Sequence, residues 1–193
     1  QETNAALFCI GTELEKFVIS RPAYWNGLIQ EIKKVYKGKL TYAANWDEFK
    51  RVPFWSELDC IGIDAYFPVT DKKTPTIEEF EAGWRPHKIE IQKIQHKFNK
   101  PILFTEYGYR SIDFTGKEPW DSKRITGSIN LLAQKNGLQA IHNQFWKEDW
   151  FLGGFIWKWF HKHTEVGGEN NNRFTPQNKP AEVLLRSLYK QAP

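Results

Sequence analysis

The stretches FCIGTELE, residues 8–15, and ILFTEYGY, residues 102–109, decide the fold. Each begins with a short apolar run that leads directly into a Thr-Glu pair, at residues 12–13 and 105–106. A carboxylate at the end of a buried strand costs free energy to desolvate unless it is paired, hydrogen-bonded or used in chemistry. Glu13 and Glu106 are therefore the first candidates for functional residues.

Five apolar runs of this kind recur along the chain and predict strands that are buried on both faces. They are ALFCIGTE (6–13), LTYAANW (40–46), LDCIGIDAYF (58–67), PILFTEYG (101–108) and FLGGFIWKW (151–159). Amphipathic segments alternate with them and predict helices over 22–36, 76–98 with interruptions, about 122–146 and 180–190. Thr76 and Glu79 fit a capping box at the start of the second helix. This alternation favours an α/β fold with parallel strands joined by right-handed crossovers.

Two architectures fit five such units, an open doubly wound sheet and part of a (β/α)8 barrel. A nucleotide-binding sheet would carry a GxGxxG turn after the first strand, where this chain has GTELE. The strands instead share polar residues at their carboxyl ends, which is where (β/α)8 enzymes build their sites. A complete barrel typically needs about 250 residues and eight strands. We therefore expect residues 1–193 to form a single partial barrel domain that lacks the N-terminal strands.

Composition excludes several other classes of protein. The 193 residues carry a net charge of +4 with no dense basic run, so nucleic acid is not expected as a partner. No stretch approaches the roughly 18 apolar residues that span a membrane, so a soluble protein is expected, with an extracellular or periplasmic location favoured over a cytoplasmic one. The five histidines form no metal-binding spacing, and we expect neither a metal nor a cofactor.

Two features of the composition bear on the core. Aromatic residues make up 16% of the chain and include nine tryptophans, which suits either an aromatic core or platforms that stack on sugars. Cys9 and Cys60 each lie inside an apolar run, which favours buried, reduced thiols over a disulfide.

Six motifs in order narrow the function. They are IGTELE, YAANW, DCIGIDAYFP, KPILFTEYGYRS, GGFIWKW and FTPQNKPAEVLL, and they are spread along nearly the whole chain, from Ile10 to Leu185. In this set the chain resembles glycoside hydrolase family 113 of the clan A retaining glycosidases, whose characterised members are β-mannanases. The resemblance implies a (β/α)8 barrel of the TIM type, of which this chain supplies about strands four to eight, and a retaining, endo-acting cleavage of β-1,4-mannosidic bonds in mannan polysaccharides.

The resemblance also assigns the two glutamates. In the clan the acid/base follows strand four and the nucleophile follows strand seven, which makes Glu13 the acid/base and Glu106 the nucleophile. Retaining chemistry places two such carboxyl groups roughly 5 to 5.5 Å apart. Glu15, in the same motif, is the alternative candidate for the acid/base. Its other interpretation is a structural or solvated carboxylate of the following loop.

Further site residues follow from the same resemblance. Tyr66 is expected to hydrogen-bond Glu106 and orient it, and Trp157 to form the platform beneath the reacting sugar. Asn45 and Trp46 are expected to contact substrate. Each could instead simply fill the barrel interior, as inner side chains of such strands commonly do.

Two positions at strand ends need separate mention. Asp64 is expected to support the site. Thr12 stands where much of the clan has an asparagine that binds the sugar 2-hydroxyl, so the contact at this position has a shorter reach.

The partners expected are an oligo- or polysaccharide substrate and the missing N-terminal half of the barrel. That half would lie upstream in the same polypeptide or in a second chain, because five barrel strands alone leave two apolar edges uncovered. Two other functions remain open. One is a catalytically incomplete glycan-binding or scaffold half-barrel, and the other is a clan A glycosidase for a different β-glycan.

Overall fold

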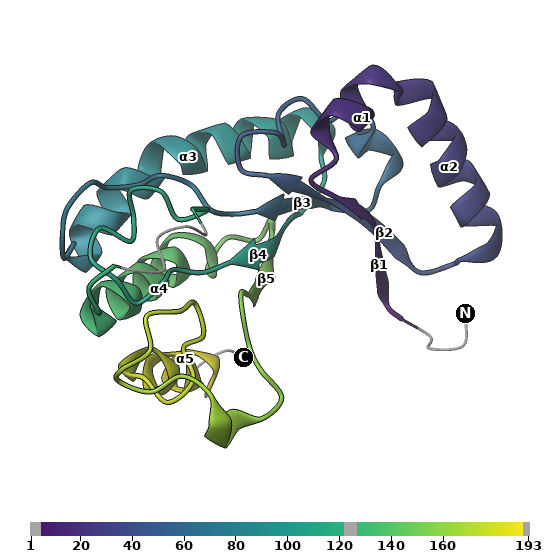
Figure 1. Ribbon diagram of the computed structural model, residues 1–193. Helices are drawn as coiled ribbons and strands as arrows, with labels where there is room; N and C mark the ends of the chain where they lie inside the picture. The colour runs from purple at the N-terminus through teal and green to yellow at the C-terminus, as the bar shows by residue number, and fades with distance from the viewer. Residues whose placement is uncertain (1–4, 122–126, 191–193) are drawn as a thin grey trace. The chain divides into compact units, whose positions relative to one another are not determined.

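The computed structural model describes residues 5–121 and 127–190, and it contains a sheet whose strand order β1-β2-β3-β4-β5 follows the order along the chain (Figure 1). The strands are β1 (Leu7–Thr12), β2 (Lys39–Asn45), β3 (Ile61–Asp64), β4 (Ile102–Tyr107) and β5 (Phe151–Ile156). Each of them lies within or overlaps one of the five apolar runs. The β3 strand is shorter than its run 58–67, since it comprises only Ile61–Asp64.

Helices follow the strands in alternation. They are α1 (Glu15–Ser20), α2 (Pro22–Val35), α3 (Ile77–Phe98), α4 (Leu131–Phe145) and α5 (Pro180–Lys190), with short 3-10 helices at Trp55–Glu57 and His163–Glu165. The capping box at the start of α3 is confirmed, since Thr76 N–H donates to Glu79 at 3.0 Å and Glu79 N–H donates to Thr76 Oγ1 at 3.2 Å. These reciprocal bonds satisfy donors that the first helical turn leaves open.

Three helical expectations need correction. The α1 helix was not expected, because six residues are too few to show a periodic pattern. The α3 helix continues through Pro86 without the expected interruption. The helix expected over about 122–146 begins only at Leu131, where Asn130 caps it by accepting the Ala133 N–H; residues 122–126 lie outside the described part of the chain.

The chain divides into two compact units. Unit 1 comprises the described residues up to Ala65 together with Ile89–Thr105 and Glu148–Gly154, and it holds most of the sheet. Unit 2 comprises Tyr66–Lys88 and the described residues of Glu106–Lys147 and of the chain from Phe155 onward. Several strand-end residues of interest therefore belong to different units.

The register of β1 shifts just before its carboxyl end. Leu7 lies opposite Lys39 and Cys9 opposite Thr41, whereas Thr12 lies opposite Ala43, one residue short of regular pairing. A bulge of this kind redirects the residues that follow it. It precedes Glu13 directly.

The core of unit 1 is aromatic and lies over β2. The rings of Trp25, Tyr42, Phe54 and Trp55 contact one another with centroids 5.3–6.3 Å apart, and all four side chains are at most 2% exposed. Trp25 comes from α2, whose buried face it shares with Ile29. Helix α2 therefore covers the sheet at the position of Tyr42.

Burial on both faces is confirmed for β3 and for most of β2, and it is wrong for β1 and β5. Phe8 on β1 is 45% exposed and Leu152 on β5 is 53% exposed. Both strands stand at an end of the strand order, so within the described residues no further strand covers them. Cys60 is buried as expected, but Cys9 is exposed for the same reason.

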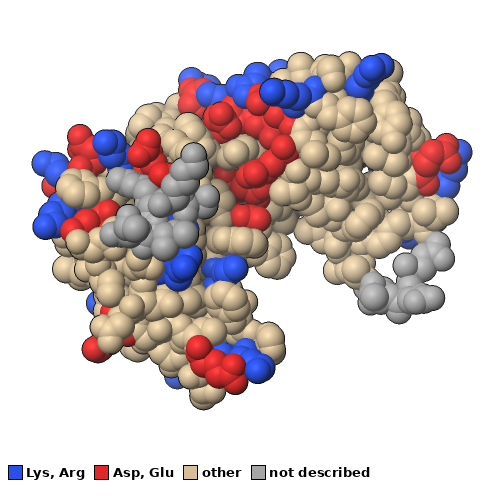
Figure 2. Space-filling view, viewed as in Figure 1, with Lys and Arg blue, Asp and Glu red and all other residues tan. Residues whose placement is uncertain are grey.

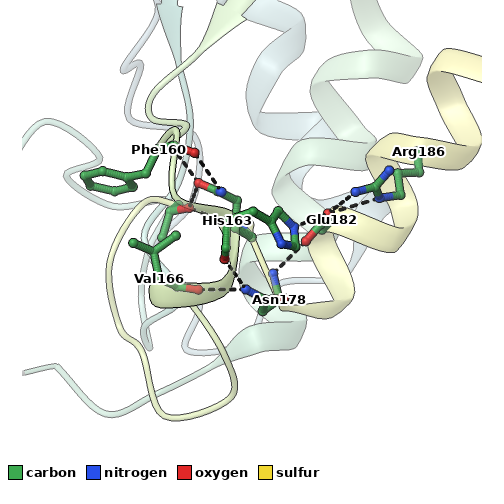
Figure 3. Close-up of polar contacts among 8 residues, drawn as sticks. Phe160, His163, Val166, Asn178, Glu182 and Arg186 are labelled. Carbon is green, nitrogen blue, oxygen red and sulfur yellow. Dashed lines mark hydrogen bonds and ion pairs between the residues drawn. The ribbon is translucent and has the colours of Figure 1, made fainter.

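The core of unit 2 joins α3, α4 and the segment after β4. Trp84 packs edge-on against Phe145 and donates its Nε1–H to the Tyr109 hydroxyl at 3.1 Å. The start of α5 is fixed by a polar cluster of His163, Asn178, Glu182 and Arg186 (Figure 3). These contacts join helices α3 and α4 to the segment after β4, and the start of α5 to the loop that precedes it.

Candidate active site

Glu13 lies in a tight turn directly after β1. Its φ is +52°, a region that non-glycine residues adopt rarely, and its N–H donates to the Ala43 carbonyl at 2.9 Å. The side chain is exposed. Thr12, the last residue of β1, is also exposed, and Glu15, two residues after Glu13, begins α1. The β-bulge and the turn together present Glu13 at the carboxyl end of its strand.

Glu15 is engaged elsewhere. Its Oε1 accepts a hydrogen bond from Arg51 Nε at 2.7 Å, and Arg51 Nη2 contacts the same oxygen. The pair links the start of α1 to the loop after β2. This arrangement favours the structural interpretation of Glu15 over a catalytic one.

Asn45 and Trp46 lie at the end of β2 and are both partly exposed. The Asn45 side-chain oxygen accepts the Trp46 N–H at 2.8 Å, and its carbonyl accepts the N–H groups of Glu48 and Phe49 at 2.9 and 3.1 Å. Asn45 therefore closes the turn after β2. Its side-chain oxygen is already used within that turn.

Asp64, at the end of β3, is fully buried, and its Oδ1 accepts a hydrogen bond from Thr105 Oγ1 at 2.7 Å. Thr105 directly precedes Glu106 on β4. Asp64 thus ties the end of its own strand to the end of the next one. Because Asp64 is fully buried and bonded to Thr105, it suits support of the strand ends rather than contact with a ligand.

Glu106 lies near the end of β4, and the Tyr66 hydroxyl donates to its Oε2 at 2.7 Å. This is the hydrogen bond expected from the sequence. Tyr66 is only 7% exposed, and its ring packs edge-on against Phe174 at 5.9 Å. The phenol is therefore held in place by packing, which fixes the direction of its hydroxyl.

Phe174 is a residue that the sequence reasoning missed. The Arg110 guanidinium lies 4.8 Å from the centre of its ring, and Gln134 Nε2 donates to the Phe174 and Tyr109 carbonyls at 2.9 Å each. Burial and the neighbouring Arg173 lower the pKa of Arg110. The signal in the sequence was the closing motif FTPQNKPAEVLL, which begins with Phe174.

Lys179 fixes the segment before Phe174. It is 3% exposed, and its Nζ donates to Ser111 Oγ at 2.9 Å, to Asn171 Oδ1 at 3.1 Å and to the Arg173 carbonyl at 2.9 Å. Burial lowers the pKa of Lys179 to about 7. All three acceptors are uncharged, so this lysine acts as a buried three-way hydrogen-bond donor.

Trp157 follows β5 and is 40% exposed. Its N–H donates to the Tyr107 carbonyl at 2.8 Å, which joins it to the residue after Glu106. Gly108 lies so close that a Cβ at this position would stand 2.4 Å from the Trp157 carbonyl oxygen. Within unit 2 the structure thus brings Tyr66, Glu106 and the Trp157 backbone to neighbouring strand ends, while Thr12, Glu13, Asn45, Trp46 and Asp64 lie in unit 1.

A profile of Glycoside Hydrolase Family 113 matches residues 1–179. The chain belongs to this family. A structure of a GH113 β-1,4-mannanase superposes on all of the chain with a TM-score of 0.83 and 25% identity. The GH113 β-mannanase of Alicyclobacillus acidocaldarius in complex with ManMIm also superposes on all of the chain, with a TM-score of 0.81 and 26% identity. The family 113 chain spans 58% and 57% of those two proteins, respectively.

A β-glucuronidase of Faecalibacterium prausnitzii shares the fold at 15% identity, with a TM-score of 0.66 over 97% of this chain and 32% of that one. No curated protein sequence matches the chain. The expected fold class is confirmed: an α/β chain of five parallel strands that corresponds to part of the barrel of family 113 structures.

The remaining expectations concern ions and surfaces. Within residues 5–121 and 127–190, no three His, Cys, Asp or Glu side chains gather as metal ligands would. None of the helices described here combines the length and apolar character needed to cross a bilayer. On the face shown in Figure 2, Lys and Arg side chains are interspersed with Asp and Glu.

Proposed function

We propose that the chain is the C-terminal part of the catalytic barrel of a retaining, endo-acting β-1,4-mannanase. The observation that carries the proposal is the 2.7 Å hydrogen bond from the packed Tyr66 hydroxyl to Glu106 near the end of β4. It supplies a carboxylate with a fixed orientation, as a nucleophile requires. Membership of family 113, with two β-mannanase structures at 25–26% identity, supports the choice of mannan as substrate.

The proposed mechanism is a double displacement. The Glu106 carboxylate attacks the anomeric carbon while the bond to the glycosidic oxygen breaks and Glu13 gives its proton to that oxygen. Glu13 then takes a proton from water, whose oxygen attacks the same carbon and releases Glu106. After the first step Glu106 is bonded to the sugar and Glu13 is ionised; the second step returns both carboxyl groups to their starting forms, and the product keeps its anomeric configuration.

The other strand-end residues take supporting roles in this proposal. Trp157, with 40% of its side chain exposed, offers a ring face on which a sugar can stack. Trp46 and Thr12 are the further substrate contacts, Asn45 shapes the turn that carries Trp46, and Asp64 keeps the β3 and β4 ends in register through Thr105.

We also propose that the remaining barrel strands complete the cleft, from the same polypeptide or from a second chain. Two observations support this. The chain spans only 58% of the β-1,4-mannanase it matches, and the end strands β1 and β5 carry the exposed apolar side chains Phe8 and Leu152. Sheet edges of this kind are normally covered in folded proteins.

The test is a hydrolysis assay on β-1,4-mannan, with the stereochemistry of the products followed by proton NMR. It compares the 193-residue chain with a protein that also carries the preceding strands of a family 113 barrel. We expect retained β-products from the longer protein and little or no hydrolysis by the shorter one. Inverted products, or no hydrolysis by either protein, would contradict the proposal.

A glycan-binding half-barrel is the second candidate, and the 58% coverage is the observation that favours it. Such a protein would bind mannooligosaccharides without turnover. Calorimetric binding by the 193-residue chain, together with absence of hydrolysis in the longer protein, would support this candidate instead. A preference for another β-glycan in the same assay would keep the mechanism and change only the sugar.

A further inference from the structure

The turn that carries Glu13 is tied to a buried pair that the proposed mechanism does not use. Leu14 N–H donates to the Tyr42 hydroxyl oxygen at 2.6 Å, and the Tyr42 O–H donates to Glu48 Oε1 at 2.8 Å. All of these residues belong to unit 1. The bonds form a continuous line from the backbone beside Glu13 to a buried carboxylate in the loop after β2.

Tyr42 has no freedom to move its hydroxyl. Its side chain is 0% exposed, and its ring contacts Trp25, Phe54 and Trp55 with centroids 5.7–6.2 Å apart. Gly11 on β1 leaves the space for this ring and its neighbour Trp25, since a Cβ there would stand 2.9 Å from Trp25 Cη2 and 3.3 Å from Tyr42 Cε2. The aromatic core therefore places the acceptor for the Leu14 amide.

Glu48 is equally fixed. It is 1% exposed, its Oε2 accepts the Asn45 N–H at 3.2 Å, and its own N–H donates to the Asn45 carbonyl at 2.9 Å. Burial raises the pKa of Glu48, the hydrogen bonds from Tyr42 and Asn45 lower it, and the charges of Glu15 and Glu13 raise it further. Both of these donors are uncharged, and a buried carboxylate is costly for a fold to maintain.

The backbone of the turn explains what this arrangement achieves. A glutamate at φ +52° is unfavourable and persists only when the surroundings fix it. Two consecutive amides of the turn are fixed to β2: Glu13 N–H by the Ala43 carbonyl, and Leu14 N–H by the Tyr42 hydroxyl. The first bond belongs to the sheet, so the second is the one that the Tyr42–Glu48 pair supplies.

We propose that Tyr42 and Glu48 are positioning residues for Glu13, which hold its turn in the geometry that proton donation needs. The inference rests on the proposed role of Glu13 as acid/base. Because the pair acts through the backbone, its loss should leave the nucleophile untouched and impair only the step that needs the proton. A general acid contributes most to substrates with poor leaving groups and little to those with good ones.

The first experiment compares Tyr42→Phe and Glu48→Gln with Tyr36→Phe. Tyr36 is the matched control, since its hydroxyl donates to the Ala5 carbonyl at 2.6 Å at the opposite end of β1. Each substitution is made in the full natural polypeptide, including any sequence that precedes residue 1. The readout is kcat/KM for aryl glycosides of one mannooligosaccharide, with either a dinitrophenyl or an unsubstituted phenyl leaving group.

We expect Tyr42→Phe to lower kcat/KM for the phenyl substrate by about tenfold to a hundredfold, and that for the dinitrophenyl substrate by about twofold or less. Glu48→Gln should lower kcat/KM for both substrates by smaller factors. Tyr36→Phe should leave kcat/KM unchanged for both. Equal losses on the two substrates in Tyr42→Phe would mean a merely structural role and would overturn the proposal.

A second measurement does not depend on activity. Amide hydrogen exchange, followed by NMR in the same proteins, should show Leu14 exchanging about fivefold faster or more in Tyr42→Phe, with no change in Tyr36→Phe. An unchanged Leu14 rate would overturn the proposal. If the wild-type protein hydrolyses no mannan, the proposed function fails, while the exchange rates still decide whether Tyr42 holds the turn.

Discussion

The cluster at the start of α5 makes a quantitative prediction about pH and stability (Figure 3). Glu182 has a side chain only 7% exposed, and it accepts hydrogen bonds from the Asn178 N–H at 2.6 Å, from His163 at 2.7 Å and from Arg186 at 2.6 and 3.0 Å. Burial acts to raise the pKa of Glu182, but these bonds outweigh it and lower the pKa from an ordinary 4.5 to about 2. The ionised carboxylate therefore stabilises the fold.

The magnitude follows from linkage. At about 1.4 kcal/mol per pKa unit, the difference between 4.5 and about 2 sets a ceiling of about 3 kcal/mol for the contribution of Glu182. Because the folded pKa is depressed, this contribution is fully present above about pH 4.5 and is lost as the pH falls through about 2. Glu182→Gln should accordingly lower the free energy of unfolding by up to about 3 kcal/mol at pH 7.

The assay is urea unfolding of both proteins at several pH values between 7 and 2, followed by circular dichroism and by amide exchange in α5. The difference between the proteins should shrink steadily below about pH 4.5. Glu165→Gln is the control, because its ion pair with Lys162 joins side chains that are 62% and 59% exposed, and such pairs contribute about 0.5 kcal/mol. A difference for Glu182→Gln that does not vary with pH, or an NMR titration of Glu182 near 4.5, would refute the reasoning.

Three predictions concern the proposed chemistry. Glu106→Ala should abolish mannan hydrolysis, and azide should restore turnover with an inverted product. Glu13→Ala should spare substrates with good leaving groups and give a retained azide product. The opposite pattern would exchange the two roles. Tyr66→Phe should lower kcat by about tenfold or more with little change in unfolding free energy, since it removes only the hydroxyl bonded to Glu106, and an unchanged kcat would contradict its orienting role. Gly108→Ala places a Cβ 2.4 Å from the Trp157 carbonyl oxygen, so it should lower the free energy of unfolding in urea by about 1–3 kcal/mol and raise KM. No change in the unfolding free energy or in KM would show that the backbone at Gly108 can shift at little cost.

Sequence reasoning located the strand ends because apolar runs bounded by polar residues are a local signal. The Thr-Glu pairs at the end of β1 and near the end of β4 were anticipated on that basis, and the Tyr66 to Glu106 bond was anticipated from the family resemblance. Helix α5 was predicted with its observed bounds, since Pro180 at its start and a strong amphipathic pattern mark it clearly.

The contacts around the candidate site were harder to predict because the partners are distant in sequence. Phe174 meets Tyr66 across 108 positions of the chain, and no local pattern indicates that contact. Tyr42 reads as an ordinary strand aromatic, and Glu48 as an ordinary loop carboxylate. The Leu14 N–H meets the Tyr42 hydroxyl just after a bulge in β1, and the apolar pattern does not encode that bulge.

The one consistent error in the fold, burial of β1 and β5, has a physical explanation that bears on function. An apolar pattern records the surroundings in which a strand folds, and Phe8 and Leu152 are as apolar as the buried residues of β2 and β3. At about 25 cal/mol per Å² of apolar surface, leaving such side chains in water forgoes free energy that a neighbouring strand would recover. The pattern of β1 and β5 therefore suits the complete barrel of the family better than the five strands alone.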